Sequence, residues 1–136
     1  MDRLTPGQLT LQHRTRCIQW NARGLSKANL EEFRQYITVV KPDIALLSET
    51  HWKPSFNAKF KSYHVLKKDR LNRPVVGVAV LVHKNLRFSP LILPNSDSME
   101  TISVTIMSSS NTPTDFISLY VPKGDCEVAD IDFFFN

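Results

Sequence analysis

The chain has 136 residues, of which 42% are hydrophobic and 22% are charged, and this composition suits one folded domain. Seventeen Lys and Arg against thirteen Asp and Glu give a net charge of +4, which is compatible with a polyanionic partner without requiring one. Cys17 and Cys126 are too few and too far apart for a disulfide framework and favour a reducing, intracellular setting; no apolar run reaches the length of a membrane span.

After a polar leader over residues 1–14, the sequence predicts a β-α-β unit. A strand is expected over residues 15–20, a helix from about 29 to 40, and a second strand over 43–49. The second strand is an almost continuous apolar run, which suits burial on both faces. A right-handed crossover makes the two strands parallel, so their carboxyl ends meet at one edge of the sheet.

The sequence indicates where the expected helix begins, where it ends and which of its faces is apolar. Its start is the capping-box spacing of Asn29 and Glu32, and its stop is Pro42, because proline cannot continue helical hydrogen bonding. The apolar residues on its one face are Leu30, Phe33, Ile37 and Val40.

The second half of the sequence predicts strands separated by turns. The candidate strands cover residues 62–69, 75–84, 86–93, 100–107 and 114–122. The segment after them, 126–136, suggests the first turns of a helix.

Polar side chains stand where three of these strands end. Asn21 follows the first strand, Glu49 the second, and Tyr120 lies at the end of the last, two residues before Pro122. Ligands of open α/β sheets bind at the carboxyl ends of strands, and a carboxylate, an amide and a phenol could hold a phosphate ester near Mg²⁺. Taken alone, each residue also has an ordinary structural explanation: Asn21 as a turn residue, Glu49 as a solvated surface residue, and Tyr120 as a half-buried packing residue.

Taken in order, these motifs resemble the endonuclease/exonuclease/phosphatase superfamily, most closely the apurinic-type endonuclease domain of non-LTR (LINE-like) retrotransposons. The resemblance rests on Asn-x-x-Gly-Leu, Ser-Glu-Thr-His, the strand in "RPVVGVAVLVHKNL", "METISVTI" and Tyr-x-Pro, and it covers about residues 16–124. The sequence departs from the family where Val75-Val76 precede a single Gly77.

The resemblance implies a role for each matched residue. Asn21 would orient the active site, Glu49 would ligate the divalent metal, and Tyr120 would contact the phosphate. Three side chains would approach DNA, although for each a structural or solvated role stays equally open. These are His51, Trp52 and Arg73.

The family's second half carries Gly-Asp-x-Asn, a further aspartate and Ser-Asp-His, and residues 1–136 contain none of these motifs. We therefore expect residues 15–136 to be a truncated domain of the α/β class, a partial four-layer αββα sandwich of the DNase I-like type. About one sheet plus its helix is expected, at most with the start of the second layer, and with the inner face of the first sheet exposed. That face would favour self-association or docking of the missing carboxy-terminal half.

The expected function is that of the amino-terminal half of a Mg²⁺-dependent DNA endonuclease that nicks target DNA for a retrotransposon alongside a reverse transcriptase. It would act on DNA in the nucleus and be inactive as the isolated chain. The resemblance implies Mg²⁺ in the complete family domain, and we expect the isolated chain to bind it weakly or not at all. Two alternatives stay open: a fragment of a repair nuclease or phosphoesterase of the same superfamily, and a non-enzymatic remnant or binding module.

Overall fold

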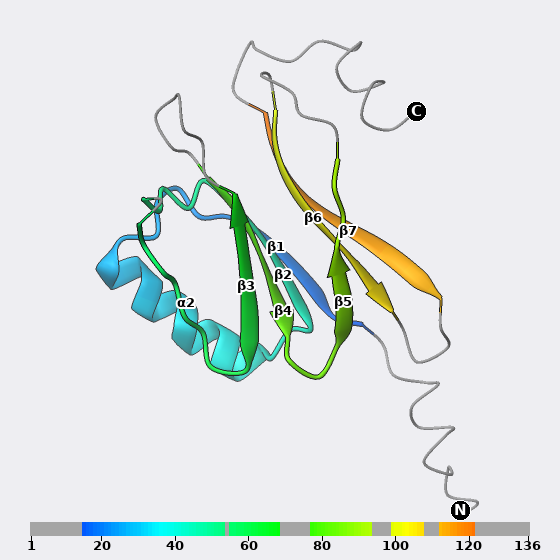
Figure 1. Ribbon diagram of the computed structural model, residues 1–136. Helices are drawn as coiled ribbons and strands as arrows, with labels where there is room; N and C mark the ends of the chain where they lie inside the picture. The colour runs from blue at the N-terminus through cyan, green and yellow to red at the C-terminus, as the bar shows by residue number, and fades with distance from the viewer. Residues whose placement is uncertain (1–14, 54, 69–76, 94–98, 108–111, 122–136) are drawn as a thin grey trace, which may run out of the picture.

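The computed structural model describes residues 15–53, 55–68, 77–93, 99–107 and 112–121 (Figure 1). Its helix and strands, in chain order, are β1 (Cys17–Asn21), α2 (Lys27–Val40), β2 (Ile44–Ser48), β3 (Tyr63–Lys68), β4 (Val78–His83), β5 (Arg87–Pro90), β6 (Glu100–Met107) and β7 (Pro113–Tyr120). The expected leader over 1–14 and the helix expected over 126–136 lie outside the described residues.

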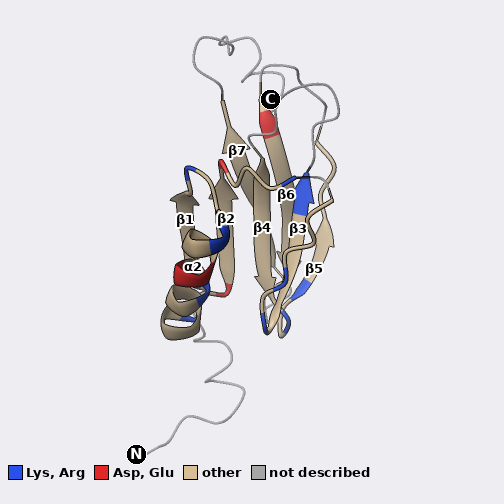
Figure 2. Ribbon diagram, turned by 90° about the vertical axis from the view of Figure 1, so that its left-hand side faces the viewer, with Lys and Arg blue, Asp and Glu red and all other residues tan. Residues whose placement is uncertain are grey.

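The first sheet contains the predicted β-α-β unit. Its strand order is β1-β2-β4-β3, with β1 and β2 parallel and the other neighbours antiparallel. Asn21 pairs with Ser48 at the carboxyl ends of β1 and β2, so the prediction that these two ends meet at one edge is confirmed. Figure 2 shows β1, β2, β4 and β3 in this order from left to right, with α2 in front of β1 and β2.

The two central strands, β2 and β4, are buried on both faces, as the apolar run of residues 44–47 predicted. Since side chains alternate along a strand, each strand contributes to two cores. One core lies against the apolar face of α2 and includes Leu30, Phe33, Ile37, Ala45, Leu47, Ala79 and Leu81. The other lies on the opposite face of the sheet and includes Ile44, Val80, Val82, Val104 and Ile106.

The second core exists because a second sheet, ordered β5-β6-β7, covers the inner face of the first. Ser118 in β7 joins the two sheets by donating its hydroxyl to the Leu47 carbonyl at 2.6 Å. The prediction of a single sheet with an exposed inner face was therefore wrong, and the argument for self-association through that face falls with it. In the described part of the chain the layers are helix, sheet and sheet (Figure 1), without a helix on the outer face of the second sheet.

The helix begins two residues earlier than expected and is not capped as expected. Ser26 occupies the N-cap position without a side-chain hydrogen bond. Asn29 lies inside the helix, and its Nδ2 donates to the Gly24 carbonyl at 3.2 Å, so the capping-box assignment was wrong. The helix ends where Lys41 adopts a left-handed conformation and its N–H reaches the Ile37 carbonyl. In the described residues, no helix has the length and apolar character needed to cross a membrane.

Candidate active site

The two strand-end residues singled out from the sequence are in direct contact. The Asn21 Nδ2 donates a hydrogen bond to Oε2 of Glu49, and the Asn21 Oδ1 accepts the Arg23 N–H at 3.2 Å. Because an amide nitrogen only donates and its oxygen only accepts, these two bonds fix the orientation of the Asn21 amide. The amide therefore holds the Glu49 carboxylate from the neighbouring strand.

The backbone beyond the strand ends is also held in place. The loop after β1 continues beside the loop after β2, donating from Ala22 to Ser48 at 2.8 Å and from Gly24 to Glu49 at 2.7 Å. A third bond from Leu25 ends at the Thr50 carbonyl at 2.9 Å. Glu49 thus sits on a hydrogen-bonded extension of the sheet, which limits its movement.

Unusual backbone conformations gather at this edge of the sheet. For residues other than glycine a positive φ costs free energy, and such residues cluster at functional sites, so the gathering of Arg23, Glu49 and His51 supports a site here. Of the described residues with positive φ, only Lys41 and Ser62 lie at the opposite edge, before β2 and β3. The others, at the site edge, are Arg23, Gly24, Glu49, His51 and Gly77.

Tyr120 ends β7 at the same end of the two-sheet stack. It is half-buried, and burial raises the pKa of its phenol, with further increases from the negative charges of Glu49 and Glu100. An ordinary tyrosine phenol has a pKa of about 10 and is already protonated at neutral pH, and the raised pKa leaves it so. Tyr120 can therefore donate a hydrogen bond to an anion, but it cannot serve as a base there.

Glu100 is a site residue that the sequence reasoning missed. It pairs with Tyr120 across β6 and β7, is 3% exposed, and accepts the Gly77 N–H on Oε1 at 3.0 Å. The signal was present in the alternation of β6: counting back in steps of two from the buried Val104 places Glu100 on the inward face. A carboxylate on an inward face needs partners, and that need marks it for attention.

Two lysines at the end of β3 were also missed. Lys68 pairs with Val78, which pairs with Ser48, so Lys68 lies in the same row across the sheet as Asn21. The neighbouring Lys67 donates its Nζ to the Lys53 carbonyl at 3.2 Å. Figure 2 shows this basic end of β3 at the same edge as the ends of β1 and β2. The sequence did contain a signal for them: the strand expected over residues 62–69 ends in charged residues, as the strand expected over 43–49 does.

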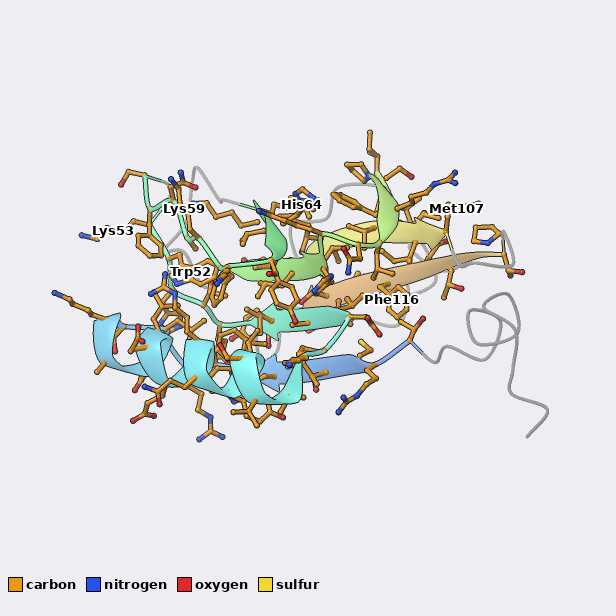
Figure 3. The ribbon with its side chains drawn as sticks, turned by 90° about the horizontal axis from the view of Figure 1, so that it is seen from below. Trp52, Lys53, Lys59, His64, Met107 and Phe116 are labelled. Carbon is orange, nitrogen blue, oxygen red and sulfur yellow. The ribbon has the colours of Figure 1, made fainter. Side chains whose placement is uncertain are left out.

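The three residues expected to approach DNA have different positions. Trp52 is 4% exposed and its ring lies 5.7 Å from that of Phe56, so it packs in the core beside α2 (Figure 3). This corrects the expectation that its ring contacts DNA. His51 is exposed and lies against Gly24, while Arg73 is outside the described residues.

The chemistry of the site fits a single protein ligand to a hard divalent cation. Mg²⁺ keeps several waters and binds through one or two carboxylates, and Glu49 is such a carboxylate, oriented by Asn21. Within the described ranges, no three His, Cys, Asp or Glu side chains cluster closely enough to hold a metal.

The architecture is similar to that of DNase I-like nucleases. One solved structure with this fold is AP endonuclease LMAP from Leishmania major, which matches with a TM-score of 0.62 and 16% sequence identity. The match covers 87% of this chain and 43% of that one, so this chain spans less than half the length of that protein. At this identity the likeness establishes the fold.

A second structure, humanized D. rerio TDP2 carrying 14 mutations, matches with a TM-score of 0.44 and 16% identity, over 68% of this chain and 42% of that one. No protein-family model and no curated protein sequence matches the chain significantly.

We predict that Gly24→Ala destabilises the fold through the loop that holds Glu49. Gly24 has φ +96, which alanine rarely adopts, and an added Cβ would lie 3.3 Å from the His51 Nδ1. We expect the free energy of unfolding to fall by about 1–3 kcal/mol, measured by urea denaturation. The same substitution in a His51→Ala background separates backbone strain from the ring contact, and nearly the same cost is expected there. A neutral Gly24→Ala would contradict the observed backbone conformation.

Proposed function

We propose that residues 15–136 are the amino-terminal part of a divalent-metal-dependent DNA endonuclease of the non-LTR retrotransposon kind. The observation that carries the proposal is the hydrogen bond from the Asn21 amide to the Glu49 carboxylate at the paired ends of two parallel strands. The fold shared with part of an AP endonuclease supports it. The retrotransposon branch rests on the sequence itself, on the Ser-Glu-Thr-His-Trp run at residues 48–52 and on the short connections between strands.

Each side chain has a distinct task in this proposal. Glu49 ligates Mg²⁺, and Asn21 holds that carboxylate in one direction. The bound cation would polarise a phosphoryl oxygen and offset the charge that develops on phosphate during hydrolysis. Tyr120, whose phenol is protonated at neutral pH, donates a hydrogen bond to the same phosphate.

The cations around the site suit a nucleic-acid backbone. Arg23, Lys53 and Lys68 are exposed on the loops and strand end at the site edge. Because β4 separates β2 from β3, the end of β3 lies about 10 Å from the end of β2, two strand spacings away. Lys68 could therefore hold a phosphate other than the one at Glu49. Such contacts bind DNA without reading its sequence and weaken as salt rises.

The metal assignment is tested with Mn²⁺, which binds oxygen ligands as Mg²⁺ does and broadens the NMR signals of nearby nuclei. In the ¹⁵N-labelled chain we expect substoichiometric Mn²⁺ to broaden the amide signals of Asn21 and Thr50 selectively. Glu49→Gln should abolish that broadening, because the neutral amide is a poor ligand for a hard cation. Glu32→Gln, an exposed carboxylate on α2, serves as the matched control and should change nothing.

Broadening that survives in Glu49→Gln, or that never centres on this edge of the sheet, would contradict the proposed function.

A further inference from the structure

Glu100 is the one charged residue among the buried polar side chains that the structure describes. Removing a carboxylate from water is costly unless hydrogen bonds to it compensate. Its Oε1 accepts the backbone N–H of Gly77 at 3.0 Å. A charge-assisted bond of this kind is about twice as strong as one between neutral groups. The carboxylate therefore anchors the backbone where β4 begins.

The anchored backbone leads directly to the loop that bears Glu49. The Gly77 carbonyl accepts the Thr50 N–H at 3.3 Å, and Thr50 follows Glu49 and is 2% exposed. Gly77 has φ +88, a backbone conformation that glycine adopts readily. In this conformation its N–H donates to Glu100 while its carbonyl accepts from Thr50. Two consecutive hydrogen bonds thus connect the buried Glu100 carboxylate in the second sheet to the end of β2 in the first.

Glu100 also adjoins the phenol of the site. It pairs with Tyr120 across the β6–β7 ladder, so both side chains point into the stack at its site end. The negative charges of Glu100 and Glu49 both act on this phenol, which places all three groups in one electrostatic neighbourhood. Glu100 therefore lies opposite Tyr120 in one sheet and is connected by the hydrogen bonds through Gly77 to the loop after Glu49 in the other.

We propose that Glu100 is a positioning residue: by anchoring Gly77, and through it Thr50, it sets the direction in which Glu49 presents its carboxylate to a divalent cation. The inference rests on the proposed function, because it assigns Glu49 the role of the metal ligand. Oε1 of Glu100 accepts the Gly77 N–H and the side chain is 3% exposed, so the proposal assigns Glu100 to the anchored backbone and Glu49 to the cation.

The test separates the reach of the side chain from its charge. Glu100→Asp keeps the charge but is one methylene too short to reach Gly77, while Glu100→Gln keeps the reach and an acceptor oxygen but loses the charge. The readout is the Mn²⁺ concentration that half-broadens the Thr50 amide signal. We expect Mn²⁺ affinity to fall about tenfold in Glu100→Asp, as is typical when a residue supporting a metal ligand is lost, and by clearly less in Glu100→Gln.

Two further variants complete the design. Asp115→Asn removes an exposed carboxylate in the first half of β7 and should leave Mn²⁺ affinity unchanged. If Glu100→Asp does not fold, Glu100→Met replaces it, because methionine fills a similar volume without an acceptor, and the same tenfold loss is expected. With only four glycines in the chain, selective ¹⁵N-glycine labelling also isolates the Gly77 amide. Its proton signal should move in Glu100→Asp.

The outcomes are distinct. A larger loss in Glu100→Gln than in Glu100→Asp would mean that Glu100 acts through its charge, and unchanged affinity in the folded variants would mean that it only stabilises the fold; either result overturns the positioning role. Absence of broadening at Thr50 in the wild-type chain would overturn the proposed function as well. Wild-type broadening that Glu100→Asp or Glu100→Met leaves unchanged would overturn the positioning role alone.

Discussion

Residues 1–136 are expected not to nick supercoiled plasmid in Mg²⁺ or Mn²⁺. Phosphodiester hydrolysis needs an activated water and donors that stabilise the charge on the pentavalent phosphorus, and a site lacking one such donor loses about a hundred- to a thousandfold in rate. In the described residues, the site offers one oriented carboxylate, an amide engaged at both ends, and a protonated phenol. None of these can take a proton from water efficiently at neutral pH, because the phenol is protonated and the carboxylate is a weak base.

The same proposal predicts activity for a longer polypeptide. If the codons after 136 encode Gly-Asp-x-Asn and Ser-Asp-His, the extended chain should nick in Mg²⁺. In that chain Glu49→Ala should lower the rate by at least about a hundredfold, because it removes the metal ligand. Arg73→Ala should instead weaken DNA binding and leave the rate at saturating DNA almost unchanged.

The deciding measurement is a plasmid-relaxation time course on the purified 136-residue chain beside its Glu49→Ala variant. An active nicking nuclease is the positive control, and EDTA is the negative control. Metal-dependent nicking by the 136-residue chain but not by Glu49→Ala would show that this part of the site is sufficient, and the expectation of inactivity would be wrong.

Much of the first sheet could be predicted because local signals and topology agreed. The apolar run at residues 44–47 required burial on both faces, and Pro42 ended the helix before it. A β-α-β crossover then left one arrangement for the strand ends, so the contact between Asn21 and Glu49 followed from connectivity. The strand boundaries moved by only one to a few residues, which is common because element ends fray.

The pairing of whole sheets could not be predicted in the same way. The sequence indicated strands from residue 100 onward. The alternation of apolar and polar residues in such a strand is the same whether its apolar face packs against a partner sheet or is exposed to water. The inward positions of β6, such as Val104 and Ile106, cover Val80 and Val82, and only the three-dimensional path of the chain shows this. The position of Trp52 was missed for a related reason: a Trp after a strand-end motif can face outward or fold back against Phe56 and Phe60.

Val80→Asp is expected to unfold the protein. Val80 is fully buried in the core between the two sheets, next to the second-sheet residue Val104. A carboxylate there would lose its hydration without a hydrogen-bonding partner, a change that costs more than about 4 kcal/mol where the group cannot reach water. Domains of this size are stable by about 5–15 kcal/mol, so the substitution removes most or all of the stability.

The matched control is Val39→Asp, the same exchange at a position on α2 that is 81% exposed. It should cost less than about 1 kcal/mol, mainly because a negative charge is unfavourable near the carboxyl end of a helix. Urea denaturation followed by circular dichroism compares the two variants, and size-exclusion chromatography reports their association. If the inner face of the first sheet were open to solvent, Val80→Asp would be almost as mild as Val39→Asp and would reduce association. The two-sheet packing instead requires a large difference between the variants, because only one of the two carboxylates would be enclosed.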